Sequence, residues 1–530
     1  MAKGYLPGLR DEPMLLPVDV RDWLPAGHVA WFVLDAVAAM DTAAVHRGRR
    51  LGGAGRAAYD PDMLLALLIY AYASGLRSSR KIEARCREDV AFMVVSGLRF
   101  PDHTTIARFR RDHDGVMEEL FTQVLLLCAR AGMGALEHVA IDGTKVAADA
   151  SPSRSRDADG LRRVVRRVLD EAQATDAAED AADTPVPGGL PPELADPERR
   201  RRVIADLLEQ VDADPDPGRL AARRRQIVTA QRAGELLDEL TGEAAAAAGV
   251  DIQAARRRVE RAEENLARIR AEVQARSDEH AERQAQAAAQ GRSLPGARPV
   301  PVAEHSHVKG AAGRAERARA RLAAKEQATP EPGTAKRNLT DPDARFMPTR
   351  SGYLLGYNCQ TAVSADHLIL AVDVTNQPGD VEQLAGMLNR LETTVSTLRH
   401  ATANPDLTIG TLLADAGYHS AANLDLPGPP RLIAQGKGHH PAGTNPPTDP
   451  PGPEATPTQQ MAWQLNTPQG RRLYKKRAST VEPVNAHLKD QRGLRRFARR
   501  GHTAALAELR LAALTTNLMH LFTTTSPATN

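Results

Sequence analysis

Cysteine is scarce in this 530-residue chain, with Cys86, Cys128 and Cys359 far apart in the sequence. This spacing excludes a disulfide framework and a CxxC zinc site, and it fits a reducing cytoplasm. Long hydrophobic runs are also missing, since the longest, Met63 to Leu76, is shorter than the ~20 residues that cross a bilayer. The first residues lack the apolar core of a signal peptide. We therefore expect a cytoplasmic protein with no membrane partner.

Aromatic residues make up only 4% of the chain, but the hydrophobic fraction of 42% is enough to build at least one sizeable core. The formal net charge is +3, and the positive charge is concentrated near the carboxyl terminus. Residues 471–500 hold eleven Lys and Arg against two acids, Glu482 and Asp490. A solvated helix face normally carries interspersed acids, so this segment indicates a polyanionic partner.

Residues 1–135 are predicted to be helical. Asp60 is suited to cap a helix that starts at Pro61 and runs to Gly75. A second helix is expected after Ser78, and a third, basic helix is expected after a cap at Asp102 or Thr104, with Arg108 and Arg111 along it. This order is compatible with a DNA-binding helix-turn-helix, and the alternative is a helical bundle with a basic exterior.

Residues 153–336 are charged, rich in Ala and interrupted by Pro/Gly clusters that we expect to act as flexible joints. Apolar residues repeat there at spacings of three and four, which predicts a coiled-coil arm: Ile252, Ala255, Val259, Ala262, Leu266, Ile269 and Val273. His305 and His307 are interpreted as residues of an exposed loop. We assign no chemistry to this arm.

Two short apolar strands are each followed by an acid and a nearby glycine. Val139 to Ile141 precede Asp142, and Thr411 to Ala414 precede Asp415; a hairpin around residues 364–366 lies between them. An acid at the end of a buried strand is costly unless it is hydrogen-bonded, paired or bound to a metal. Each acid alone could cap a turn or a helix.

Glu482 is the prominent acid of the basic segment, and with Asp142 and Asp415 it completes a set of three carboxylates. Such a set can hold two Mg²⁺ ions ~4 Å apart for phosphodiester chemistry, while nearby Lys and Arg neutralise the nucleic-acid backbone. The order strand-Asp, hairpin, strand-Asp, basic helix-Glu favours this interpretation over three unrelated caps.

Four separated motifs resemble the DDE-type insertion-sequence transposases, most closely the insertion-sequence family numbered 1182. The resemblance covers most of residues 1–150 and 336–525. It rests on the helical segments at 59–97 and 101–111, on "AIDGTKVAADAS", on "LLADAGYHS", and on "YKKRASTVEPVNAHLKDQRGLRRFARRG". It implies an α/β catalytic domain with a ribonuclease H-like fold and a mixed sheet, interrupted by a helical insertion and preceded by an all-α domain.

The resemblance also implies roles for individual residues. Asp142, Asp415 and Glu482 would be the catalytic metal ligands, for two Mg²⁺ ions or for Mn²⁺. Tyr474, Arg477, Glu482 and Lys489 look like the Tyr-Arg-Glu-Lys signature, although four residues separate Arg477 from Glu482 where the signature has three. The DNA contacts would come from the following residues: Tyr474, Arg477, Lys489, Lys145, Arg492, Arg495, Arg496, Arg108 and Arg111. Asp149 and Asp380 are interpreted as structural acids, and His419 as a hydrogen-bonded loop residue.

The expected protein is a transposase, associated with the nucleoid of a prokaryote, that cleaves the ends of its element and joins them to target DNA. The expected partners are double-stranded DNA, as terminal inverted repeats and target, and a second copy of the chain. The predicted layout is a helical DNA-binding and dimerisation domain at 1–135, a first strand at 136–152, the insertion at 153–336, and the remaining catalytic domain at 337–525. The alternatives are a nuclease without strand transfer and an inactive, regulatory DNA-binding protein.

Overall fold

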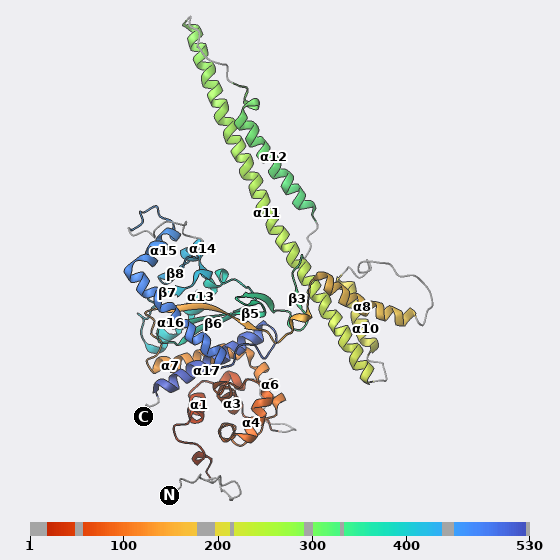
Figure 1. Ribbon diagram of the computed structural model, residues 1–530, viewed down its shortest axis with the longest axis vertical. Helices are drawn as coiled ribbons and strands as arrows, with labels where there is room; N and C mark the ends of the chain where they lie inside the picture. The colour runs from red at the N-terminus through yellow and green to blue at the C-terminus, as the bar shows by residue number, and fades with distance from the viewer. Residues whose placement is uncertain are drawn as a thin grey trace, which may run out of the picture. The chain divides into compact units, whose positions relative to one another are not determined.

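The computed structural model describes residues 19–47, 57–177, 197–211, 217–290, 300–328, 333–436 and 450–525 (Figure 1). They form two compact units, one made of Met1–Arg154 with Thr340–Asn530 and the other of Ser155–Leu339. The second unit therefore starts two residues after, and ends three residues after, the insertion predicted at 153–336. In the described residues, no helix combines the length and apolar character that crossing a bilayer requires.

The first unit begins with a series of short helices, and Asp60 caps the most buried of them, as predicted. Its carboxylate accepts a hydrogen bond from the Asp62 backbone, and Pro61 takes the first helical position. These helices are α1 (Val29–Ala38), α2 (Ala43–His46), α3 (Pro61–Ala73), α4 (Ser79–Glu88), α5 (Val90–Val95), α6 (His103–Asp112) and α7 (Met117–Arg130), with 3₁₀ turns η1 (Val20–Asp22) and η2 (Asp114–Val116).

The helix predicted after Ser78 is broken in two at Asp89. This residue has extended backbone angles, and its side chain caps α5 by accepting hydrogen bonds from the Ala91 and Phe92 backbone. Asp102 caps α6 in the same way. The simple helix-turn-helix order is therefore corrected to three helices, α4, α5 and α6, because an Asp competes locally for backbone N–H groups.

A mixed sheet lies at the centre of the first unit, in the order β4-β5-β1-β7-β8, with β6 also paired to β5. The pairs that β5 forms with β1, β4 and β6 are antiparallel, whereas β1, β7 and β8 are parallel. Ile141 and Leu370 both lie in this sheet, although the insertion separates them in the sequence. The strands are β1 (Val139–Ala147), β4 (Arg345–Thr349), β5 (Gly352–Ser364), β6 (Ile369–Thr375), β7 (Leu412–Ala414) and β8 (Arg431–Ile433).

Helices cover this sheet, and two of them position the features discussed below. Helix α16 (Pro468–Asp490) packs on β1 and β5, while α17 (His502–Thr525) contacts β6, α7 and α3. The buried Asn517 of α17 exchanges two hydrogen bonds of 2.9 Å with the backbone of Ile369. The remaining elements are η3 (Pro152–Arg154), η5 (Val381–Gln383), α13 (Leu384–Thr402), η6 (Ala416–Tyr418), α14 (Ala421–Asp425) and α15 (Pro457–Asn466).

The amino-terminal helices and the sheet share one hydrophobic core, although the sequence predicts a separate helical domain at 1–135. The long run of buried residues in α17 explains the difference. Because α17 is apolar around most of its circumference, it buries one side against β6 and others against α3 and α7. The helical segment is thus part of the core of the first unit.

The second unit is helical and is closed by a two-residue pair of strands, β2 (Ser155–Arg156) with β3 (Arg337–Asn338). Its helices are α8 (Ala158–Ala177), α10 (Pro197–Val211), α11 (Pro217–Ala289), η4 (Val302–Glu304) and α12 (Ser306–Gln327). The predicted Pro/Gly joints fall largely outside the described residues, at 178–196, 212–216 and 329–332.

Helices α11 and α12 contact each other in the region where the sequence predicts a coiled-coil arm. Ion pairs between them join Asp251 to Lys325 at 2.6 Å and Arg256 to Glu326 at 2.9 Å, and Glu263 pairs with Arg319 further along. From the first two pairs to Glu263–Arg319 the residue numbers rise along α11 and fall along α12, so the helices are antiparallel. The predicted seam faces this contact only in part, since Ala255 is buried and the other six residues are half-buried.

Candidate active site

Two of the predicted acids lie side by side because their strands are parallel neighbours. The β1–β7 register pairs Ile141 with Ala414, so Asp142 and Asp415 occupy the next position on each chain. Asp415 directly follows β7 and caps η6, and its Oδ1 accepts a 2.8 Å hydrogen bond from Gly417 N. Parallel strands therefore bring two carboxylates together from positions 273 residues apart.

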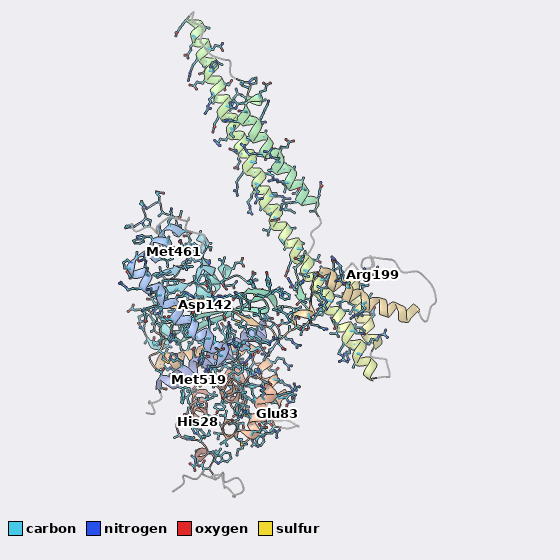
Figure 2. All side chains as sticks on the ribbon, in the orientation of Figure 1. His28, Glu83, Asp142, Arg199, Met461 and Met519 are labelled. Atoms are coloured by element: carbon cyan, nitrogen blue, oxygen red, sulfur yellow. The ribbon has the colours of Figure 1, made fainter. Side chains whose placement is uncertain are left out.

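Asp142 lies within its strand, whereas the sequence predicts that the strand stops before it. β1 continues to Ala147 because β5 pairs with its other edge as far as Gly356. The pairing with β7 stops at Ile141, so that edge of β1 is open from Asp142 until Ala147, which forms a parallel bridge with Arg496. Figure 2 labels Asp142 among the side chains of the sheet region.

Glu482 reaches the site from α16, where Arg477 connects it to Asp142. The guanidinium Nη2 lies 3.1 Å from Glu482 Oε1, and Nη1 lies 3.6 Å from Asp142 Oδ1. The Arg477 side chain is 15% exposed and that of Glu482 is 60% exposed. Glu482 is therefore at the solvent side of the site.

The three acids are more widely spaced than the few ångströms that the sequence interpretation requires. Among the described residues, one group of three possible ligand side chains has its atoms within 4.8 Å of one another, and it does not include these acids. That group is His46, Asp60 and Asp62, which are exposed or half-buried around the start of α3. Between Asp142 and Glu482, the Arg477 guanidinium occupies the space where a cation would balance the two carboxylates. Two carboxylates that lie near each other repel, and a positive charge between them offsets this repulsion.

Asn485 and Thr361 hold Asp142 in place, and neither was identified from the sequence as a site residue. Asn485 Nδ2 donates to Asp142 Oδ2 at 3.0 Å, and Thr361 Oγ1 donates to Asn485 Oδ1 at 2.9 Å. Both side chains are buried. Asn485 lies three residues after Glu482, so one helix supplies both an acid and a group that orients another acid.

Burial raises the pKa of Asp142 to about 6. Arg477 and the Asn485 hydrogen bond act in the opposite direction, whereas the nearby Asp415 and Asp380 raise the pKa further. An acid whose charged form is disfavoured by burial and by neighbouring acids is a typical cation ligand, since a cation removes both penalties.

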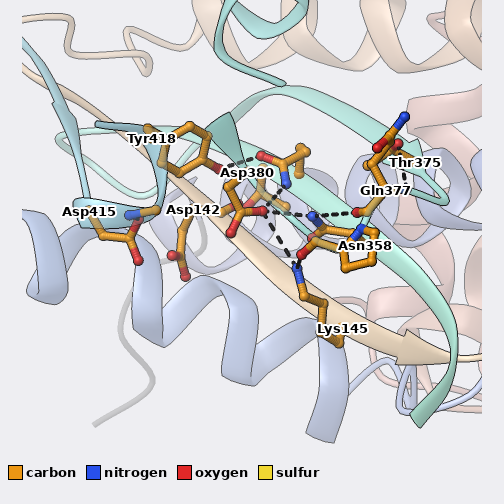
Figure 3. Close-up of polar contacts among 12 residues, drawn as sticks. Asp142, Lys145, Asn358, Thr375, Gln377, Asp380, Asp415 and Tyr418 are labelled. Atoms are coloured by element: carbon orange, nitrogen blue, oxygen red, sulfur yellow. Dashed lines mark hydrogen bonds and ion pairs between the residues drawn. The ribbon is translucent and has the colours of Figure 1, made fainter. Parts of the chain in front are cut away.

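Asp380 also belongs to this site, although the sequence interpretation treats it as a structural acid. Its Oδ1 accepts hydrogen bonds from Asn358 at 2.6 Å and Gln360 at 2.8 Å (Figure 3). Lys145 Nζ lies 3.6 Å from the same oxygen and donates to the Pro378 carbonyl at 2.8 Å. Tyr418 donates from its hydroxyl to Gln360. The only sequence signal was an acid that follows a strand in "TNQPGD".

The predicted DNA-contacting residues divide into exposed and internal groups. Arg108, Arg111, Arg495 and Arg496 are exposed, and Lys489 is half-buried, with a pKa lowered by burial. Tyr474 donates its hydroxyl to the Ala414 carbonyl at 3.3 Å, just before Asp415, and Lys145 is engaged as described above.

The role predicted for Arg492 is wrong. The resemblance implies that Arg492 contacts DNA, but its side chain is buried in the structure. The residue is 4% exposed and donates to the Ala73 carbonyl at 2.7 Å and to Thr516 Oγ1 at 3.3 Å. Its guanidinium satisfies a carbonyl at the carboxyl end of α3, a position that leaves orphan acceptors. It therefore stabilises the fold.

The donor set of the site fits a hard divalent cation. Asp142, Asp415 and Glu482 offer only carboxylate oxygens, the ligands that Mg²⁺ prefers. The Nη1 atom of Arg477 is buried without a hydrogen-bond partner among the described residues. The guanidinium therefore does not satisfy all of its own hydrogen-bonding groups in this position. These residues would hold the cation if Arg477 turned away.

Comparison with protein families gives two matches. Residues 18–112 match a transposase domain (DUF772), and residues 453–522 match a transposase DDE domain. These two matches support a DDE-type insertion-sequence transposase. No curated protein and no solved structure matches this chain. The matched segments include Glu482 but neither Asp142 nor Asp415, and the narrower resemblance to the family numbered 1182 stays a prediction.

Proposed function

We propose that this transposase cleaves the ends of its element and joins the freed 3′-hydroxyl to target DNA. Asp142, Asp415 and Glu482 would hold two divalent cations, Mg²⁺ or Mn²⁺. The observation that carries the proposal is the β1–β7 register, which sets two acids side by side near the helix that bears Glu482. A mixed sheet with acids at adjacent parallel strands also supports a ribonuclease H-like domain.

The bound cations would activate the attacking oxygen and stabilise the leaving oxygen of the phosphodiester. The chain's own residues prepare the site for this. Asn485, supported by Thr361, fixes the orientation of Asp142, and the Tyr474 hydroxyl fixes the backbone before Asp415. Arg477 neutralises Asp142 and Glu482, and it is placed to pair with a DNA phosphate once it turns away from them.

A nuclease with the same acids would cleave but would not join, so a joining assay separates the two functions. The purified chain is given a precut, labelled element end with a free 3′-hydroxyl, a target plasmid and Mg²⁺. We expect joined products that disappear when the 3′-hydroxyl is replaced by a 3′-deoxy end. Cleavage of uncut ends without any joined product would favour the nuclease, and DNA binding without either reaction would favour the regulatory protein.

A groove in the first unit, lined by residues other than those of the acidic site, offers a path for the DNA backbone. It has a volume of about 650 Å³ and lies between the start of α4, helix α6 and the segment at 498–499. Six arginines and no acids line it: Arg77, Arg80, Arg108, Arg110, Arg111 and Arg499. Arg77 pairs with Glu508 at 2.6 Å, and Arg499 pairs with Asp114. These ion pairs hold the two arginine side chains in place along one side of the groove. Arg80 and Arg108 are exposed.

We propose that Arg80 and Arg108 contact phosphates of the element end. Arg496 lines a second, adjoining cavity of about 370 Å³ that shares Arg77 with the groove. The exposed Arg495 and the half-buried Lys489 would extend this basic surface. A synaptic complex must hold two ends at once, so we propose that a homodimer presents two such grooves.

Replacing Arg80 and Arg108 together by Ala is expected to weaken binding of element-end DNA and to make it less sensitive to salt. If each contacts one phosphate, the slope of log K against log salt falls by about 1.8, since each lost contact contributes ~0.9. Binding isotherms at several salt concentrations measure this. Arg130→Ala, an exposed arginine outside the groove, is the matched control. An unchanged slope would show that the DNA takes another path.

A further inference from the structure

Asp380 lies close to Asp142 and Asp415. A purely structural acid would be poorly placed there, because like charges repel. We propose that its carboxylate is a fourth ligand for the divalent cations of this site, next to Asp415. The proposal rests on the proposed function, because it assumes that Asp142 and Asp415 bind cations. It assigns the cation-binding oxygens to four acids from four different elements.

The two oxygens of Asp380 have different surroundings. Oδ1 accepts from the amides of Asn358 and Gln360 and lies near Lys145. Oδ2 accepts no hydrogen bond from the described part of the chain. A carboxylate that is fixed through one oxygen and open at the other is the arrangement that outer hydrogen bonds impose on metal ligands. Figure 3 shows the Asp380 carboxylate with Lys145 on one side and with Asp142 and Asp415 on the other.

Two glycines allow Asp380 to come this close. A methyl group at Gly143, the residue after Asp142, would overlap the Asp380 carboxylate and lie 2.7 Å from Gln360 Nε2. A methyl group at Gly417 would lie 3.0 Å from Asp415 Oδ1 and 3.2 Å from Asp380 Oδ2. The last two oxygens therefore both lie within 3.2 Å of one point beside Gly417.

The sheet explains how acids from both of its faces meet. Successive residues of β1 point to opposite faces, so Asp142 faces Asn485 while Gly143 and Lys145 face Asp380. β7 stops at Ala414, one position before Asp415, and leaves this edge of β1 uncovered. Asp142 and Asp380 can thus approach Asp415 around the open edge.

A titration of the full-length chain with Mn²⁺, followed by electron paramagnetic resonance of the free ion, tests the proposal without measuring activity. Asp380→Asn keeps the size of the side chain and its contact with Gln360, and we expect it to weaken Mn²⁺ binding about tenfold or more. Asp149→Asn removes an acid that pairs with Arg500 elsewhere, and it should leave binding unchanged. Lys145→Met should bind Mn²⁺ at least as tightly, because it removes a nearby positive charge.

The outcomes separate this proposal from the proposed function. If Asp142→Asn and Asp415→Asn weaken binding and Asp380→Asn does not, Asp380 is no ligand and the function stands. If none of the three changes Mn²⁺ binding, the metal site itself is refuted. If Lys145→Met weakens binding as much as Asp380→Asn, Asp380 acts only as an anchor for Lys145.

A second variant keeps the test decisive if Asp380→Asn does not fold. Asp380→Cys introduces a thiolate, which prefers soft cations. A ligand at this position should shift the preference of the site from Mn²⁺ toward Cd²⁺ by about tenfold or more, measured by competition between the two ions. An unchanged ratio of Cd²⁺ to Mn²⁺ affinity would overturn the proposal.

Discussion

Asp142→Asn, Asp415→Asn and Glu482→Gln are each expected to lower Mg²⁺-dependent cleavage of element ends by about 10³-fold or more. Each change removes a negative charge from the site, and losing a bound cation costs several kcal/mol of transition-state stabilisation. Binding of end DNA should stay within a few-fold, because these acids do not contribute to phosphate neutralisation. Single-turnover cleavage and binding isotherms on the same labelled end measure both quantities.

Asp149→Asn is the matched control, since it removes an acid beyond the site and should cleave like the natural chain. Cleavage at the natural rate by any of the three site variants would refute the assignment of that acid. A parallel loss of DNA binding would instead indicate that the substitution disrupts the unit.

The stability of Asp142→Asn provides an independent check that this variant folds. The pKa of Asp142 is raised to about 6 in the folded chain, above its ordinary value, so the folded state binds the proton more tightly. Its ionised form therefore destabilises the metal-free fold, and this cost grows as pH rises from about 4 to 6. Above pH 6 the variant should be more stable by up to about 3 kcal/mol, and below pH 4 the difference should vanish.

Glu508→Ala is expected to lower the free energy of unfolding of the first unit by about 3–5 kcal/mol. The Glu508 side chain is fully buried in α17, where it accepts from Arg77 at 2.6 Å and from the Ala498 backbone at 3.0 Å. Without it, the largely buried Arg77 loses its counter-charge and a backbone N–H loses its acceptor. Urea unfolding, followed by circular dichroism, measures the change.

Glu119→Ala, an exposed acid on α7, controls for the loss of a negative charge and should change the unfolding free energy by less than about 0.5 kcal/mol. Glu508→Gln should fall between the two variants, because the amide keeps an acceptor for Ala498. A loss below about 1 kcal/mol for Glu508→Ala would mean that the pair does not stabilise this junction.

The sequence predicts well those features that depend on a few neighbouring residues. Asp60 and Asp102 are recognisable as helix caps because the Asp comes directly before a helix-forming run. The sequence also singles out Asp142 and Asp415 as acids that follow short apolar runs, whereas the parallel register that sets them side by side is seen only in the structure.

Features that depend on distant contacts were missed. Nothing local distinguishes the buried Arg492 from the exposed Arg495 and Arg496, because its burial follows from the position of α3, more than 400 residues earlier. Asp380 and Asn485 acquire their contacts with the site through the sheet and through α16. The shared core of helices and sheet likewise depends on α17, the last element of the chain.

The order of the strands has a consequence for synthesis on the ribosome. The central strand β1 emerges early, but its partner β5 follows only after the whole inserted arm, since Ala147 pairs with Gly356. At ~5–20 residues per second, this delay is roughly 10–40 seconds. During that time the backbone N–H and C=O groups along the edges of a nascent β1 have no native partner, whereas the arm can complete its own helices. During synthesis, β1 must therefore stay apart from other chains until about two-thirds of the protein has been translated.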